Sequence, residues 1–165
     1  MLASHMDGWV SGRIHVTAMV GEPPQMLGWS DGDALHYPVL GEGVEIGAYS
    51  CVDAGFEYPT RIGAGSWVMK QVHVGHDCVL GERVTIASGS VLGGFVEVGD
   101  DSKLGLGVVV LPYRVIGKGC TIGAGAVVTR SVPDGETWAG NPARRVERNS
   151  VPFSERYLLE HVGKI

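Results

Sequence analysis

Residues 74–98 have the sequence VGHDCVLGERVTIASGSVLGGFVEV, in which an aliphatic residue returns at every sixth position. A period of six fits neither an α-helix, which repeats every ~3.6 residues, nor a plain strand, whose side chains alternate. It fits a short strand followed by a turn. The series runs without a miss over Ile62, Val68, Val74, Leu80, Ile86, Leu92, Val98, Leu104, Val110, Ile116, Ile122 and Val128.

Two further positions of the repeat support this interpretation. Glycine often directly follows the aliphatic residue, and a small or β-branched residue stands four places after it, with Arg114 as the exception. We predict that the aliphatic side chain points inward, the small residue fills a corner and the glycine relieves the turn. Glycine accounts for 26 of the 165 residues, well above its usual share of about 7%.

Three such units make one triangular coil of eighteen residues, and each coil stacks its strands on those of the previous coil. The sequence therefore predicts an all-β fold, a parallel β-helix. This repeat resembles the hexapeptide-repeat family, closely so over residues 40–146. The resemblance implies that the coils wind left-handed, against the usual rule for crossover connections.

The repeat also predicts the organisation of the chain. We expect residues 7–146 to form the β-helix, with loops inserted at residues 22–39 and 53–61 where the period breaks. Residues 1–6 have the composition of a cloning scar and are excluded from the fold. Residues 147–165 are expected to form a cap, with Ser154 at the start of a short helix over residues 155–162.

Composition excludes several classes of function. Thirteen Lys and Arg against eighteen Asp and Glu give a net charge of −5, which argues against non-specific electrostatic binding to nucleic acid. The sequence has no apolar run of the ~20 residues that a membrane span requires. Three cysteines without metal-type spacing predict no metal site and favour a reducing, cytoplasmic location.

The eighteen-residue coil predicts which side chains lie above one another. His73 should lie in line with Val91, Val109 and Val127, and such an outward apolar row is best explained by a partner subunit around a three-fold axis. His76 should lie beneath Gly94, which would leave open space and an accessible N–H above the imidazole.

This second row can carry chemistry. A neutral imidazole at His76 can take a proton from an amine or a hydroxyl nucleophile. The amide of Gly94 could stabilise the oxyanion of a tetrahedral intermediate, and Asp77 could orient the imidazole, although it could equally form a turn.

Residues 73–146 also resemble nucleotide-amino-sugar N-acetyltransferases of the sialic-acid and bacillosamine type. The motifs that carry this resemblance are HDCVL at 76–80, VLGG at 91–94, IGAGAVV at 122–128 and GNPAR at 140–144. The resemblance implies a general base at His76, an oxyanion amide at Gly94 and active sites between the subunits of a homotrimer. It also implies an acetyl-CoA site that comprises Gly105, Ala124, Gly125, Arg144 and Arg145.

The acceptor is expected to be an amino sugar, and we expect it to contact His73, Asp53, Tyr58 and Trp29. Enzymes of this type often carry a separate N-terminal domain that binds the nucleotide sugar, and we expect the two inserted loops to serve in its place here.

Other functions remain open at this point. The phrase at 73–78 also resembles acyl-carrier-protein-dependent acyltransferases of lipid A synthesis, and transfer to a hydroxyl group is a further alternative. A γ-type zinc carbonic anhydrase ranks lower, because His73 and His76 are three apart and no third histidine is in register. A non-catalytic scaffold would not need the row of His76 and Gly94.

Overall fold

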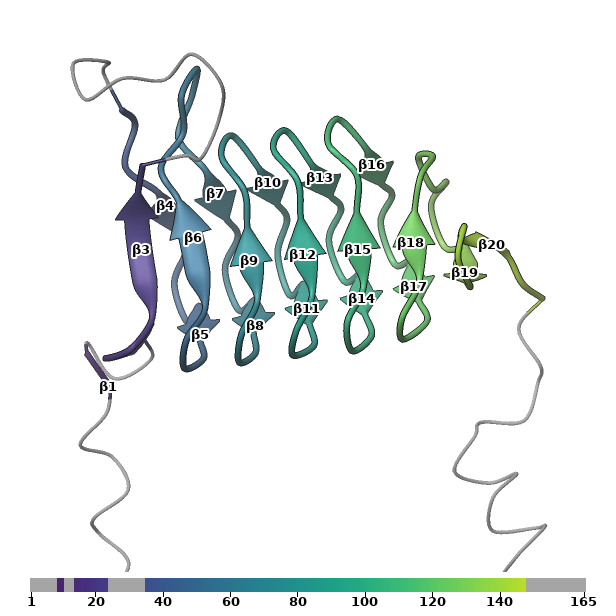
Figure 1. Ribbon diagram of the computed structural model, residues 1–165, viewed down its shortest axis with the longest axis horizontal. Helices are drawn as coiled ribbons and strands as arrows, with labels where there is room; N and C mark the ends of the chain where they lie inside the picture. The colour runs from purple at the N-terminus through teal and green to yellow at the C-terminus, as the bar shows by residue number, and fades with distance from the viewer. Residues whose placement is uncertain (1–8, 11–13, 24–34, 148–165) are drawn as a thin grey trace, which may run out of the picture.

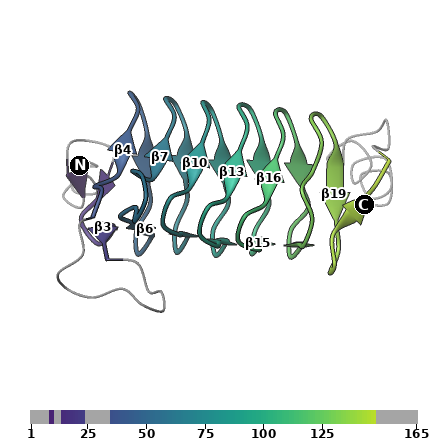
Figure 2. The ribbon, with the colours of Figure 1, turned by 90° about the horizontal axis from the view of Figure 1, so that it is seen from above.

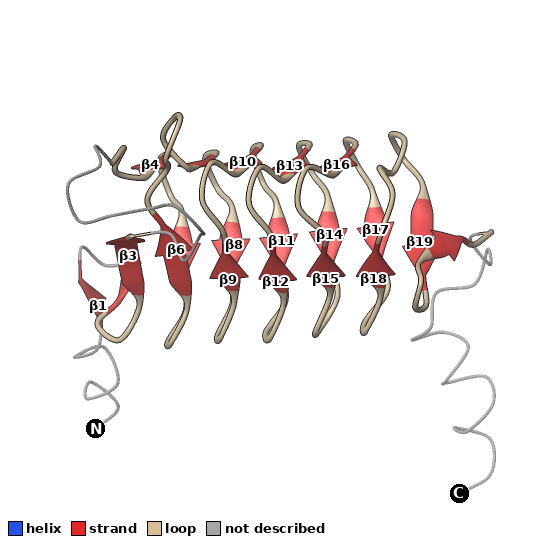
Figure 3. Cartoon of the chain, turned by 45° about the horizontal axis from the view of Figure 1, so that its top comes forward, coloured by secondary structure: helices blue, strands red, loops and turns tan. Residues whose placement is uncertain are grey.

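The computed structural model describes residues 9–10, 14–23 and 35–147. Within these ranges the chain forms strands and turns only, wound into a left-handed β-helix with three faces (Figure 1, Figure 3). The predicted helix at 155–162, the scar at 1–6 and Trp29 lie outside the described residues.

Each face is a sheet whose strands are mostly two residues long. The first face contains β2 (Ile14–His15), β5 (Glu45–Ile46), β8 (Trp67–Val68), β11 (Thr85–Ile86), β14 (Lys103–Leu104), β17 (Thr121–Ile122) and β19 (Thr137–Ala139). It ends in antiparallel strands on both sides, β1 (Trp9–Val10) and β20 (Arg144–Arg145).

The other two sheets are wholly parallel. The second face contains β3 (Met19–Glu22), β6 (Cys51–Asp53), β9 (His73–Val74), β12 (Val91–Leu92), β15 (Val109–Val110) and β18 (Val127–Val128). The third face contains β4 (Val39–Leu40), β7 (Arg61–Ile62), β10 (Val79–Leu80), β13 (Glu97–Val98) and β16 (Val115–Ile116), which lie in a row in Figure 2.

Strand pairing confirms the predicted coil length. Val91 pairs with Val109, and Val109 with Val127, so neighbouring coils are offset by eighteen residues. The loop after β6 lengthens one coil, so Cys51 pairs with His73. The loop after β3 lengthens another, so Met19 pairs with Cys51. The insertions therefore leave the stacking of the coils intact and only increase the sequence separation between paired strands.

The core is the aliphatic ladder that the period predicts. All twelve residues from Ile62 to Val128 in the series are at most 2% exposed. Because each ladder position rests on the same position of the next coil, the apolar interior is continuous along the axis.

The small residues at the corners also join neighbouring coils by hydrogen bonds. The hydroxyl of Ser102 donates to the carbonyl of Gly117 (2.7 Å) and accepts from the N–H of Cys120 (2.9 Å). Ser66 and Ser90 make the same type of bridge. Arg114 interrupts this pattern, and its buried Nε has no hydrogen-bond partner among the described residues.

The prediction that the glycine after each aliphatic residue relieves the turn is wrong. A Cβ at Gly75 would lie 2.9 Å from the carbonyl oxygen of Leu92 in the next coil, so glycine is needed there because the coils approach closely. The left-handed backbone falls two residues later, as at Gly89 (φ +74°) and Asp77 (φ +58°).

Among the described residues, no helix is long and apolar enough to cross a membrane.

Candidate active site

His76 lies in the turn between β9 and β10, at the corner where the second face meets the third. Gly94 occupies the same corner one coil further along. The prediction of open space above His76 is wrong, because a Cβ at residue 94 would lie 2.5 Å from Nε2 of His76. The imidazole itself fills the space that the glycine leaves.

The predicted amide of Gly94 remains unused. Its N–H donates to no other group within residues 35–147, whereas the next N–H, that of Phe95, donates to the carbonyl of His76 (3.0 Å). The corner therefore places a free backbone donor beside the imidazole.

Asp77 orients the ring of His76. Its Oδ2 lies 2.7 Å from Nδ1 of His76, and its carboxylate is fully buried, whereas the imidazole retains 16% of its exposure. A proton on Nδ1 directed at this carboxylate leaves Nε2 as the proton acceptor. This arrangement is what a general base requires.

The loop at 53–61 holds the carboxylate of Asp77 in place. The carboxylate accepts hydrogen bonds from the backbone N–H groups of Phe56 (3.0 Å), Glu57 (2.8 Å) and Tyr58 (2.8 Å). Burial alone would raise the pKa of Asp77, but these amides and His76 outweigh burial and lower it. The inserted loop thus fixes the position of Asp77, the residue that orients His76.

His73 and Asp53 also come together, as two of the residues expected to contact the acceptor. Nε2 of His73 lies 3.6 Å from Oδ2 of Asp53, and the thiol of Cys51 donates to Oδ1 of Asp53 (3.4 Å). Burial raises the pKa of Asp53, and the neighbouring His73 opposes that shift. Burial, followed by the charge of Asp53, raises the pKa of Cys51 to about 12.

These three donor atoms lie within 4.8 Å of one another and form the cluster among the described residues that could hold a metal ion. Sequence analysis missed Cys51, because the loop after β6 shifts the register that brings it beside His73.

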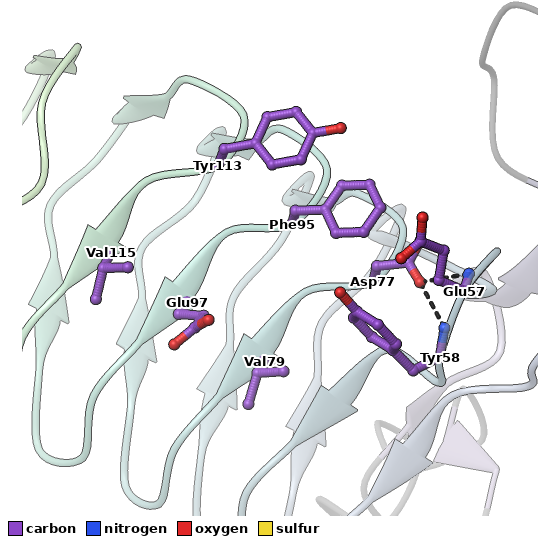
Figure 4. A pocket seen from close by; sticks show the side chains of 8 residues that line it. All are labelled: Glu57, Tyr58, Asp77, Val79, Phe95, Glu97, Tyr113 and Val115. Carbon is purple, nitrogen blue, oxygen red and sulfur yellow. Dashed lines mark hydrogen bonds between the residues drawn. The ribbon is translucent and has the colours of Figure 1, made fainter.

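An aromatic row extends from this corner. The ring of Phe95 meets that of His76 edge-on at 5.1 Å and stacks on that of Tyr113 at 4.8 Å, while Tyr58 meets Phe95 edge-on at 6.0 Å. Figure 4 shows the rings of Tyr58, Phe95 and Tyr113 beside the third face, where they line a groove of about 310 Å³. Sequence analysis missed Phe95 and Tyr113, although they occupy the position of Asp77 one and two coils further along.

The residues expected to bind acetyl-CoA lie away from His76 within one chain. Gly105, Ala124 and Gly125 occupy the corner between the first and second faces, and Arg144 and Arg145 lie on the terminal strand β20. Arg145 pairs with Glu136 at 3.3 Å. We call the corner with Gly105, Ala124 and Gly125 the coenzyme corner. It lies on one side of the second face, and the corner with His76 lies on the other side.

The pattern of the coils matches a known sequence family. The bacterial transferase hexapeptide (six repeats) model matches residues 59–94 and 95–130, which contain His76, Asp77 and Gly94. The chain belongs to the hexapeptide-repeat transferase family. This placement confirms the family predicted from the period.

Individual hexapeptide-repeat transferases extend the comparison. UDP-3-O-acylglucosamine N-acyltransferase of Caulobacter sp. (strain K31) is 39% identical over 140 residues, which is 82% of this chain and 41% of that protein. Acyl-[acyl-carrier-protein]–UDP-N-acetylglucosamine O-acyltransferase of Campylobacter concisus (strain 13826) is 26% identical over 93% of this chain and 59% of its own length.

A solved structure provides a third comparison. A variant of perosamine N-acetyltransferase from Caulobacter crescentus, in complex with CoA and GDP-perosamine, superposes with a TM-score of 0.67 at 31% identity. The match covers 82% of this chain and 56% of that one. The chain therefore spans less than two thirds of the length of each of these three relatives.

Proposed function

We propose that this chain is an acyltransferase that moves an acetyl group from acetyl-CoA to the amino group of a nucleotide-linked amino sugar. The observation that carries the proposal is the chain of contacts from the loop amides through Asp77 to His76, beside the free amide of Gly94. Two relatives named above act on nucleotide-linked sugars in N-acylation, which supports the choice of acceptor.

The geometry supports direct attack of the amine on the thioester carbonyl. Nε2 of His76 takes a proton from the amine as the C–N bond forms, and the buried Asp77 stabilises the imidazolium that results. The tetrahedral intermediate carries its negative charge on the former carbonyl oxygen, within reach of the N–H of Gly94. Collapse expels the thiolate of coenzyme A, which takes up the proton from His76.

We further propose that the active form is a homotrimer. Val91 is 40% exposed on the second face, in line with Val109 and Val127. Packing of this face against a neighbour would bring the coenzyme corner of one subunit towards His76 of another. The location of the two sets of residues at different corners of one chain supports this arrangement.

A thiol-release assay with acetyl-CoA and a panel of nucleotide-linked amino sugars tests the proposal. We expect His76→Ala to lower kcat by about 10²–10⁴-fold without loss of the folded structure. His36→Ala is the control and should retain normal turnover, because the His36 imidazole is exposed and the substitution leaves the backbone pairing of His36 with Gly55 in the inserted loop unchanged. Near-normal turnover in His76→Ala would contradict the assignment of the base.

A second candidate is transfer of a longer acyl group from an acyl carrier protein. A second groove of about 330 Å³ adjoins the aromatic one along the third face, and Val79, Val98, Val115 and Ile116 are among its lining residues. Such a surface suits an alkyl chain. Comparison of acetyl-CoA with long-chain acyl carrier protein as donor separates the two candidates by their kcat/KM.

A further inference from the structure

Three side chains that commonly bind metal ions lie together on the second face and take no part in the mechanism proposed above. Cys51 and Asp53 belong to β6, and His73 belongs to the neighbouring strand β9, where it pairs with Cys51 (Figure 1). Side chains alternate along a strand, and Val52 and Val74 point into the core. The cysteine, the aspartate and the histidine therefore project from the outer side of this face.

Asp53 is a buried carboxylate with few partners. It is 5% exposed, and within the described residues it accepts one hydrogen bond, from the thiol of Cys51, and pairs with His73 instead of with a lysine or an arginine. Glu22 pairs with Asp53 from β3 and adds a second negative charge nearby. Buried carboxylates are ordinarily hydrogen-bonded, paired with a cation or bound to a metal ion. A cation at this position would offset the cost of burying Asp53.

The donor atoms are spaced as tetrahedral zinc requires. Bonds of about 2.0–2.3 Å to nitrogen, oxygen and sulfur place the ligand atoms roughly 3.3–3.7 Å apart around the ion. The sulfur of Cys51 lies 3.4 Å from Oδ1 of Asp53, and Nε2 of His73 lies 3.6 Å from Oδ2. Thiolate and imidazole ligands favour zinc, whereas Mg²⁺ and Ca²⁺ take oxygen ligands.

We propose that Cys51, Asp53 and His73 form a zinc site with three protein ligands. Cys51 binds as the thiolate and releases its proton to solvent, Asp53 binds through a carboxylate oxygen, and His73 binds through Nε2. Water takes the fourth position, on the outer side of the face, where the side chain of His73 is 42% exposed.

The ion would tie β6 to β9 at the start of the inserted loop, the same loop whose amides hold Asp77. Its role is thus structural. The proposed acyl transfer uses none of the three ligands, so this inference does not rest on that function.

Titration of the whole chain, freed of metal by a chelator, with Co²⁺ as a spectroscopic substitute for zinc tests the site. We expect one equivalent to bind and to give a near-ultraviolet charge-transfer band from the thiolate of Cys51 to cobalt. Zn²⁺ should displace the cobalt and abolish the band, because it binds such ligands more tightly. Excess Mg²⁺ should leave the band unchanged.

Two variants assign the ligands. Cys51→Ser should abolish the band, and His73→Gln should weaken zinc binding by more than the ~10–100-fold that loss of an outer-shell partner costs. Cys120→Ser is the matched control, because it also removes one thiol but lies at a corner position that serine occupies in other coils, as at Ser102. The control should keep the band.

Thermal unfolding provides a measurement that does not depend on the spectrum. Zinc at about a hundredfold excess over its Kd should raise the Tm of the wild type by about 5–10 °C. The Tm of Cys51→Ser should rise by much less, and a cooperative transition in this variant shows that it is folded.

A charge-transfer band that persists in Cys51→Ser overturns the inference, and so does zinc affinity that is unchanged in His73→Gln. Cobalt that binds the wild type without such a band overturns it as well. These measurements contain neither acyl donor nor acceptor, so their outcome is independent of the test of transferase activity.

Discussion

At the scale of single residues, Asp77 accepts four hydrogen bonds through one buried carboxylate, three from backbone amides and one from His76. Its backbone φ of +58° is typical of Asn, Asp and Gly, so the turn itself suits this residue type. A single side chain therefore joins the inserted loop to the candidate base, and its ionisation should affect both stability and rate.

Asp77→Asn tests this joint role across pH. The lowered pKa means that the carboxylate stabilises the fold fully above its unfolded pKa of about 3.9, and that this stabilisation is lost as pH falls through the folded value. We expect Asp77→Asn to be less stable than wild type by a constant amount above about pH 5 and the difference to shrink below about pH 4. Urea unfolding at several pH values measures it.

The same variant should also reduce kcat, by about tenfold or more, because the orientation of His76 is lost. Asp101→Asn is the matched control. Asp101 occupies the same left-handed turn position (φ +61°), but its carboxylate is exposed and pairs with Arg83. Its loss should leave kcat unchanged and cost little stability, and that cost should vanish in high salt.

At the scale of elements, each two-residue strand is too short to be stable alone and depends on the coils beside it. The corner serines supply part of this coupling, since each hydroxyl bridges backbone groups of neighbouring turns. The sequence predicted small residues at these corners from their volume. It could not predict the bridges, because they depend on which carbonyl of the adjacent coil faces the hydroxyl.

Ser102→Ala should show how much one serine bridge contributes to the free energy of unfolding. The substitution leaves the carbonyl of Gly117 and the N–H of Cys120 buried without the hydroxyl, at a cost of about 1–3 kcal/mol in the free energy of unfolding. Ser102→Cys should recover part of this loss, since the thiol of Cys120 already donates to a carbonyl in the next position of this row. Denaturant titration checks the difference, with Ser88→Ala as control, because Ser88 is a half-buried turn serine whose hydroxyl makes no hydrogen bond within residues 35–147.

At the scale of the whole molecule, the period of six predicted the three faces, the ladder core and the stacking of His76 under Gly94. The part of the site that escaped prediction depends on the inserted loop. The amides of residues 56–58 reach Asp77 across some twenty positions of sequence, and no periodicity relates them. Nor did the repeat reveal that the residues expected to bind coenzyme lie at a different corner from the base.

The trimer prediction belongs to this scale. We expect the wild type to have the mass of three chains in light scattering, and the double variant Val91→Asp, Val109→Asp to dissociate, because it places charges in the outward apolar row. Thr85→Asp, on the first face, should remain trimeric. Dissociation should also abolish transferase activity, and an active monomer would contradict a site shared between subunits.

The first face ends in reversed strands, β1 against β2 and β20 against β19. A stack of parallel coils has no internal reason to stop, because the last coil offers the next one the same unpaired edge. The antiparallel strands β1 and β20 cover the outer edges of β2 and β19, so the edge that this face presents at each end is a strand of only two residues. So short an edge offers few unpaired backbone groups to another chain, which is one way in which natural sheets limit edge-to-edge association.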